Sequence, residues 1–178
     1  MATVCVFCAS SEQIAAHYIE LATEVGAELA RRGHSLVSGG GSVSCMGAVA
    51  KAARAGGAWT VGVIPDALRA REVADLAADE LIVTPDMRTR KAEMDRRADA
   101  FLVLPGGLGT LEELLEIWVA KALGMHDKPI VILDPDDVFV PLREQVRRLV
   151  DGGFARPAAL AEVSWARDIP TAFNLLPH

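Results

Sequence analysis

Cysteine is scarce in this sequence, which has three cysteines among its 178 residues. Cys5 and Cys8 share one short apolar stretch, and Cys45 stands alone further along the chain. A disulfide framework or a four-ligand zinc site would need a larger and paired set of ligands, and the four histidines are scattered. We therefore expect reduced cysteines, no metal site and no bound cofactor.

An excess of positive charge and long apolar runs are also missing. The formal net charge is -6 and no block of Lys or Arg occurs, which argues against a surface for nucleic acid. No apolar run approaches the about 18 residues that cross a bilayer, and the chain starts on a strand pattern without a basic and then apolar leader. We expect a cytoplasmic protein whose partner is a small molecule, with neither nucleic acid nor a membrane.

Hydrophobic residues make up 51% of the sequence, enough for one sizeable core, so we expect a single domain over residues 1–178. Short apolar runs alternate with stretches of helical periodicity throughout. This alternation is typical of α/β proteins and predicts a Rossmann-like, doubly wound parallel sheet, in which ligands bind at the carboxyl ends of the strands. The expected strands are 3–8, 34–37, 59–64, 80–83, 101–104 and 129–133, with an edge strand at 161–163, and the main expected helices are 12–32, 46–55, 140–150 and 169–176.

Residues 101–118, FLVLPGGLGTLEELLEIW, predict a buried strand, a glycine turn and a helix. Thr110 is a candidate N-cap for that helix, with Glu113 as its capping-box partner. A helix N-terminus attracts phosphate, and glycines let an anion approach the backbone. The alternative is a purely structural turn. Glu112 and Glu113 are adjacent and cannot both serve as the same cap, so the pair of carboxylates favours a functional site.

Three other stretches are candidates for ligand contact. Ser10 follows the first strand and either contacts a ligand or caps the next helix. The turn GGGSVSCMG holds Gly40 and Gly41, which either contact a phosphate or nucleoside or only permit a tight turn; it lacks the G-x-G-x-x-G fingerprint. The stretch 68–78 is expected to cover the mouth of the site, with Glu72 either facing the ligand or remaining a solvated carboxylate.

Two motifs together resemble a known family. The segment MRTRKAEM at 87–94, followed by PGGLGTLEE at 105–113, is similar to the paired signature of the Lonely-guy (LOG) family. Members are phosphoribohydrolases that release free cytokinin base from its riboside 5′-monophosphate. The pattern P-G-G-x-G-T-x-x-E is met in full, and Arg90 and Lys91 match the family's Arg-Lys pair. The resemblance implies hydrolysis of the N-glycosidic bond of cytokinin riboside 5′-monophosphates and of AMP.

The resemblance also implies roles for individual residues. Arg90 and Glu113 would be catalytic, with Glu113 acting at the ribose. Glu112 and Glu72 would bind the ribose hydroxyls or the base, although the sequence leaves open which of the two adjacent glutamates is catalytic. The residues expected to bind substrate are Ser10, Gly40, Gly41, Glu72, Met87, Arg90, Lys91, Gly106, Gly107, Gly109, Thr110 and Glu112, of which Gly106 to Thr110 would hold the 5′-phosphate.

Departures from the family pattern and rival interpretations remain. Ser44 and Cys45 replace a later Gly and Leu of the second glycine turn, and Ala9 also departs, as in actinobacterial members.

The rivals are a non-catalytic nucleotide or molybdenum-cofactor carrier of the same fold, and a Rossmann oxidoreductase, which the missing fingerprint opposes. The resemblance implies a homodimer, in which Trp118, Leu123 and Met125 face either a partner or the subunit's own core.

Overall fold

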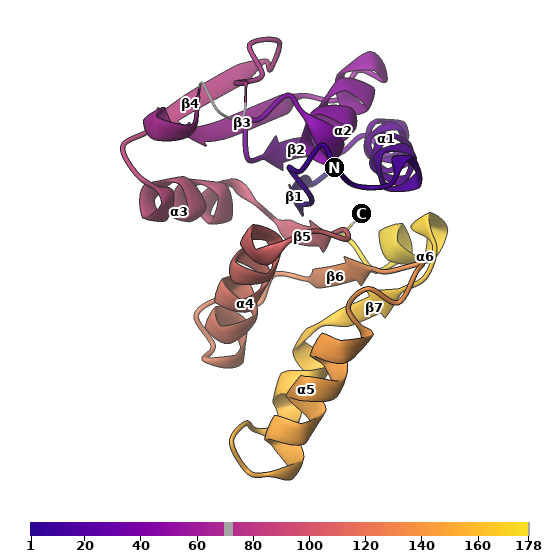
Figure 1. Ribbon diagram of the computed structural model, residues 1–178, viewed down its shortest axis with the longest axis vertical. Helices are drawn as coiled ribbons and strands as arrows, with labels where there is room; N and C mark the ends of the chain where they lie inside the picture. Colours follow the sequence, from indigo (N-terminus) through magenta and orange to yellow (C-terminus); the bar gives the residue numbers. More distant parts are fainter. Residues whose placement is uncertain (70–72, 178) are drawn as a thin grey trace.

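The computed structural model describes residues 1–69 and 73–177, and a single parallel sheet runs through it (Figure 1). The strand order is β4-β3-β2-β1-β5-β6-β7, and every pairing is parallel. The predicted doubly wound, Rossmann-like sheet is therefore confirmed. The strands are β1 (Thr3–Phe7), β2 (Ser35–Ser38), β3 (Thr60–Pro65), β4 (Glu80–Thr84), β5 (Ala100–Val103), β6 (Ile130–Leu133) and β7 (Ser164–Ala166).

Helices cover both faces of the sheet (Figure 1). One face carries α1 (Ala16–Arg31), α2 (Ser44–Ala55) and α6 (Ile169–Asn174), and the other carries α3 (Met87–Arg97), α4 (Leu108–Ala122) and α5 (Val140–Asp151). Two short 3-10 helices, η1 (Asp66–Leu68) and η2 (Pro157–Glu162), lie in the connections.

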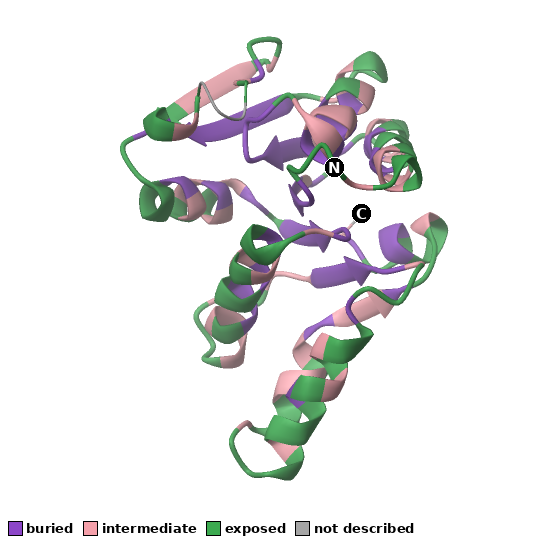
Figure 2. Cartoon of the chain, viewed as in Figure 1, coloured by how far each residue is buried: buried purple, intermediate pink, exposed green. Residues whose placement is uncertain are grey.

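The central strands are buried on both faces, as parallel strands between two helical layers must be (Figure 2). Side chains alternate along β1, so that Val4 and Val6 join the core beneath α1, α2 and α6, whereas Cys5 and Phe7 join the core beneath α3, α4 and α5. The sheet therefore separates two apolar cores. No helix within residues 1–69 and 73–177 is long and apolar enough to cross a membrane.

The three cysteines are free and buried. Cys5 and Cys8 lie in the protein interior, and desolvation by burial raises the pKa of both thiols well above its usual value. Because these thiols stay protonated, they pack as small apolar groups.

Helix ends follow local chemistry where a polar side chain is available. The Asp86 carboxylate accepts a hydrogen bond from the Thr89 backbone N–H at 2.8 Å, so Asp86 caps the start of α3. Gly33 follows α1 with a φ of 73°, the left-handed geometry that glycine adopts without strain. However, α1 begins at Ala16 and not near residue 12, so residues 8–15 form a loop at the carboxyl end of β1.

Two further predictions about secondary structure are wrong. The N-cap of α4 is Gly107 and not Thr110, because the helix begins at Leu108 and Thr110 packs, buried, against Gly106. The edge strand is Ser164–Ala166 and not 161–163. The chain before it forms η2, whose Ala159 carbonyl accepts the indole N–H of Trp118 at 2.8 Å.

Candidate active site

A cavity of about 450 Å³ opens at the carboxyl ends of the central strands. The strand order changes direction between β1 and β5, and the chain after β1 enters one helical layer whereas the chain after β5 enters the other. Such a switch point is the usual ligand site of a doubly wound sheet, and the volume suits a small ligand. The wall combines the loop after β1, the starts of α2 and α3, and the turn that leads into α4.

The first turn of α4 forms one side of this cavity. Gly107, Leu108, Gly109 and Thr110 all line it, and within the described chain no side chain caps the helix start. A Cβ added at Gly107 or Gly109 would meet no atom within 4 Å, and neither glycine has the positive φ that demands glycine. Because the protein itself does not require these two glycines, their effect is to leave backbone N–H groups open to the cavity.

Arg90 projects from α3 to the cavity wall and is only 4% exposed. Its Nε donates a hydrogen bond to the Val63 carbonyl at 3.0 Å, and its Nη2 donates to the Gly39 carbonyl at 3.1 Å. A Cβ at Gly39 would lie 1.9 Å from Nη2, so this glycine makes room for the guanidinium. The carbonyl groups of two neighbouring strand ends therefore fix the orientation of Arg90.

Glu113 lines the cavity one turn into α4, and its side chain is 11% exposed. Its Oε1 lies 3.8 Å from Nη1 of Arg90. Since Gly107 is the N-cap, Glu113 does not serve as the capping-box partner that the sequence suggested. A carboxylate and a guanidinium thus face each other beside the open amides of the helix start.

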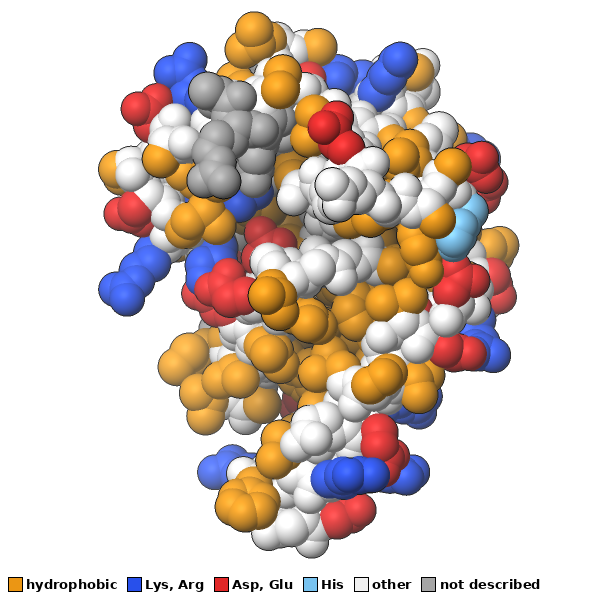
Figure 3. Space-filling model, in the orientation of Figure 1, with side chains coloured by type: hydrophobic (Ala, Val, Ile, Leu, Met, Phe, Trp, Pro, Cys, Tyr) orange, Lys and Arg blue, Asp and Glu red, His pale blue; other side chains and the backbone are white. Residues whose placement is uncertain are grey.

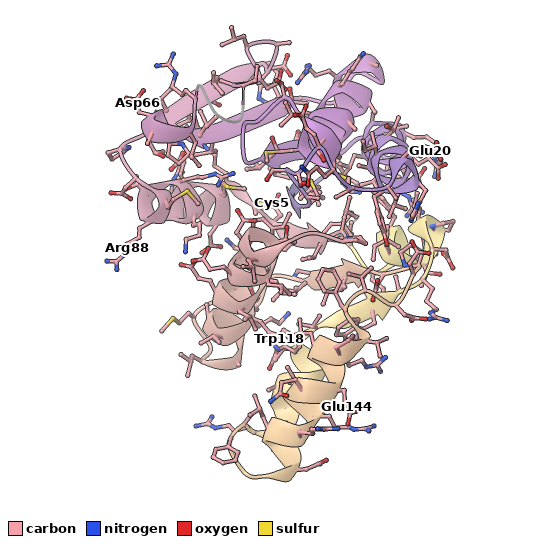
Figure 4. All side chains as sticks on the ribbon, viewed as in Figure 1. Cys5, Glu20, Asp66, Arg88, Trp118 and Glu144 are labelled. Atoms are coloured by element: carbon pink, nitrogen blue, oxygen red, sulfur yellow. The ribbon has the colours of Figure 1, made fainter. Side chains whose placement is uncertain are left out.

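Lys91, the neighbour of Arg90, lies in a different environment. Its Nζ contacts Glu112 and donates to Oε2 of Glu116 at 2.6 Å. Both hydrogen bonds raise the pKa of Lys91, and the one to Glu112 has the larger effect. Lys91 and Glu116 line a second cavity between α3 and α4, where Glu113 forms part of the wall. Arg88 points away from the molecule (Figure 4).

The cavity brings together most of the residues that the sequence predicted. Gly40 and Gly41 do not line it; they are buried, and Gly40 packs against Val63 and Ile64 with a φ of 75°. Lys91 and Glu112 also lie outside its wall, and Glu72 lies outside the described residues. The predicted residues on the wall are Ser10, Met87, Arg90, Gly106, Gly107, Gly109, Thr110 and Glu113.

Ser44 and Cys45, which depart from the family pattern in the second glycine turn, form hydrogen bonds to the segment that follows β1. The Ser44 hydroxyl donates to the Ser11 carbonyl at 2.6 Å, and the Cys45 thiol donates to the Tyr18 carbonyl at 3.3 Å. Both contacts hold the start of α2 against the segment that follows β1. Ser44 and Cys45 therefore stabilise the segment that forms part of the cavity wall.

An apolar part of the wall was not predicted from the sequence. Its side chains come from segments that are far apart in the chain, so no local motif could reveal them. One of these segments is held by the Asp134 carboxylate, which accepts the backbone N–H groups of Val138 and Phe139, both at 2.8 Å. The apolar wall consists of Ile14, Tyr18, Met46, Leu68 and Val138.

We also examined whether the described residues could bind a metal ion. Across residues 1–69 and 73–177, no three His, Cys, Asp or Glu side chains are grouped in a way that could hold a metal ion. The charged groups on the cavity wall are Arg90 and Glu113.

Comparison with known proteins identifies the family. A family model described as "Possible lysine decarboxylase" matches residues 46–176. A cytokinin riboside 5'-monophosphate phosphoribohydrolase of Mycobacterium tuberculosis is 57% identical over 158 residues, which cover 89% of this chain and 84% of that protein. An Arabidopsis thaliana protein of the same name is 43% identical over 173 residues, covering 97% of this chain and 79% of that one.

A solved structure shares the fold. The molybdenum cofactor binding protein of the phototrophic bacterium Rippkaea orientalis has a TM-score of 0.75 at 23% identity, with 98% of this chain and 94% of that chain covered. At this identity the likeness concerns the fold alone. Because the family model spans most of the chain, and the two relatives match along nearly all of it, this chain belongs to the same family as these phosphoribohydrolases, the Lonely-guy (LOG) family, whose family model carries the description "Possible lysine decarboxylase".

Proposed function

We propose that this protein hydrolyses the N-glycosidic bond of cytokinin riboside 5′-monophosphates, which yields the free base and ribose 5-phosphate. The observation that carries the proposal is the pair formed by Glu113 and Arg90, 3.8 Å apart, in a cavity that also exposes the first amides of α4. The names of the relatives from Mycobacterium tuberculosis and Arabidopsis thaliana support the same activity.

The 5′-phosphate of the substrate binds at the turn that runs from Gly106 to Thr110. Backbone N–H groups at a helix start carry partial positive charge and bind anions. The open space beside Gly107 and Gly109 lets phosphate oxygens reach these groups without meeting a side chain. Binding there places the ribose one helical turn away, next to Glu113.

Glu113 and Arg90 supply the two charges that the reaction requires. As the bond from C1′ to the purine nitrogen breaks, positive charge develops on the ribose and negative charge on the leaving base. The Glu113 carboxylate stabilises the ribosyl cation or activates the attacking water, and Arg90 positions the substrate or assists the leaving group. Water adds its oxygen to C1′, and its proton balances the charge on the released base.

Glu113 is the catalytic member of the adjacent glutamate pair in this proposal. Its side chain faces Arg90 across the cavity wall, whereas Glu112 is 56% exposed and contacts Lys91. The apolar wall formed by Ile14, Tyr18, Met46, Leu68 and Val138 suits the base of a cytokinin nucleotide better than a charged ligand.

The carrier and AMP interpretations have less support. The solved molybdenum cofactor binding protein shares the fold at 23% identity, whereas the relatives that share 43% and 57% of their aligned residues are named phosphoribohydrolases of cytokinin nucleotides. A carrier would also have no use for a carboxylate held against a guanidinium beside the ribose position.

A homodimer in the cytoplasm forms part of the proposal. Hydrophobic side chains gather over α4 and α5 on the surface (Figure 3). Leu123 and Met125, at the end of α4, are 64% and 73% exposed, and a second subunit would cover them. Trp118, in contrast, is buried in the subunit's own core. Free buried cysteines agree with a reducing compartment.

Direct measurement of the products tests this function. We expect the protein, incubated with isopentenyladenosine 5′-monophosphate, to release the free base and ribose 5-phosphate in equal amounts without any added cofactor. Parallel incubation with AMP measures the preference for the modified base. Tight binding of both nucleotides without release of either base would contradict the proposal and favour a carrier.

A further inference from the structure

Lys91 follows the catalytic Arg90 in sequence but does not reach the nucleotide cavity. Its ammonium group contacts Glu112 and Glu116, one helical turn apart on α4. We propose that Lys91 is a positioning residue, which neutralises these two glutamates and so keeps Glu113 ionised and opposite Arg90, and that it is not a ligand of the substrate. This inference rests on the proposed function of Glu113.

The geometry places two charge contacts side by side between α3 and α4. Arg90 faces Glu113 at 3.8 Å on the cavity side, and Lys91 reaches Glu116 at 2.6 Å on the other side. A second cavity of about 400 Å³ separates the two helices at this point, with Lys91, Glu113 and Glu116 in its wall. The lysine side chain therefore bridges the gap that would otherwise let α3 and α4 change their spacing.

Charge on α4 supplies the electrostatic part of the argument. Glu116 follows Glu113 by three positions and Glu112 by four, the spacings at which side chains on one helix are neighbours, so its carboxylate repels the other two unless a cation intervenes. Repulsion from two neighbouring anions favours the protonated form of a third carboxyl group. Lys91, whose side chain is 14% exposed, places its ammonium group against both Glu112 and Glu116 and removes this repulsion.

Other groups that face Glu113 do not replace this function. Arg90 and Asp95 come from α3, and their charges oppose each other. Cys5 lies in β1 and Cys8 directly follows this strand, and burial raises the pKa of both thiols and keeps them uncharged. The His126 ring lies in the second cavity with its Nε2 2.9 Å from the Ile117 carbonyl oxygen. Lys91 is the cation that contacts Glu112 and Glu116 in the described part of the chain.

Kinetics separate a positioning residue from a substrate ligand. For Lys91→Met we expect kcat to fall about tenfold below neutral pH while KM changes less than about twofold, since no substrate contact is lost. The acid limb of the pH profile of kcat should move upward by about one pH unit, which is the shift that a tenfold fall corresponds to. Lys91→Arg should restore both values.

Further variants tie the effect to charge. Adding Glu112→Gln and Glu116→Gln to Lys91→Met removes the repelling anions, so the acid limb should return toward its original position. Arg97→Met is the matched control and should leave the profile unchanged, because Arg97 lies at the end of α3 and pairs with Glu93 of α3 and Glu80 of β4. A raised KM for Lys91→Met with an unmoved acid limb would overturn the inference and assign Lys91 to the substrate.

A titration without substrate keeps this test separate from the proposed function. In protein with ¹³C-labelled glutamate, the Glu113 carboxyl signal is identified by its loss in Glu113→Gln. We expect that signal to titrate at a higher pH in Lys91→Met, and at a lower pH in Glu112→Gln/Glu116→Gln, than in the original protein. Unchanged titration in both variants would refute the role of Lys91 even if the enzyme proves active. Absence of base release by the original protein would refute the function instead.

Discussion

Single glycines have different physical roles at the candidate site. Gly39 leaves room for the Arg90 guanidinium, and Gly106 leaves room for Thr110, whose Oγ1 would lie 2.1 Å from an added Cβ. Gly107 and Gly109, in contrast, have open space on the side where a Cβ would be. The first two glycines shape the wall of the cavity, and the other two keep its amides accessible.

The substitution Gly39→Ala tests the fixed orientation of Arg90. The atom that the new Cβ would meet, 1.9 Å away, belongs to the end of a side chain, which can move without unfolding the protein. We expect kcat to fall at least about a hundredfold through misplacement of the guanidinium. The thermal midpoint should change by only a few degrees, because the backbone of β2 stays intact.

Activity and calorimetry on the same preparation check this expectation. Full activity in Gly39→Ala, with unchanged stability, would contradict the view that the Val63 and Gly39 carbonyls hold Arg90 in its working position.

At this scale the sequence indicated the charged residues but not their partners. Arg90 and Glu113 lie in the two motifs that resemble the LOG family, and this resemblance, more than the spacing of the residues, assigned both of them to the site. The contact of Lys91 with Glu112 and Glu116 depends on how α3 and α4 sit on the sheet, which no spacing specifies. The apolar wall, with residues as distant as Ile14 and Val138, has no local signal either.

The sequence predicted which segments form helices and strands more accurately than it predicted where these elements begin and end. The alternation of apolar runs and helical periodicity indicated the sheet, whereas the start of α4 depended on a contact within the glycine turn that residue preferences do not reveal. Thr110 has the side chain of a good N-cap, but its packing against Gly106 places it inside the first turn. The helix α1 starts later than predicted because Cys8 to Ser11, together with Ile14, line the cavity instead of extending the helix.

Glu28 links α1 to the end of the chain and gives a pH-dependent contribution to stability. Hydrogen bonds from Arg31 and Arg32 lower the pKa of Glu28 to about 2, and Arg32 also donates to the Asn174 side chain in α6. A carboxyl group with a lowered folded-state pKa stabilises the fold above its unfolded pKa of about 4.5 and loses this contribution as the pH falls toward about 2.

The substitution Glu28→Gln should therefore destabilise the protein only when Glu28 is ionised. We expect a loss of about 1 kcal/mol in the free energy of unfolding at neutral pH, modest because solvent screens the exposed Arg31. Urea unfolding of both proteins from neutral pH down to pH 3, about midway through the transition, measures the difference. A difference that stays constant with pH would show that packing, and not the charge, is responsible.

On the scale of the whole molecule, the order of the strands creates the site. The sequence indicated parallel strands but not that β1 and β5 would be neighbours, which requires pairing between segments about a hundred residues apart. This neighbourhood brings the loop after β1 next to the glycine turn after β5. The large apolar surface at the end of α4 is the other property of the whole molecule that bears on function.

Assembly can be tested by charging that surface. We expect the double variant Leu123→Glu/Met125→Glu to sediment as a monomer at concentrations where the original protein is a dimer, because an apolar interface cannot bury unpaired carboxylates. Leu76→Glu is the control, since Leu76 is 81% exposed and lies between β3 and β4. Dimers that persist in the double variant would place the interface elsewhere.

The central claim is that Glu113, held opposite Arg90 beside the amides of α4, breaks the glycosidic bond. It is tested most directly by comparing base release and nucleotide binding in Glu113→Gln, with Glu144→Gln on the distant α5 as a matched control (Figure 4). We predict that Glu113→Gln lowers base release from isopentenyladenosine 5′-monophosphate by at least about a thousandfold while the nucleotide still binds measurably, because the charge on the ribose is no longer stabilised. Turnover by Glu113→Gln equal to that of Glu144→Gln would contradict the claim.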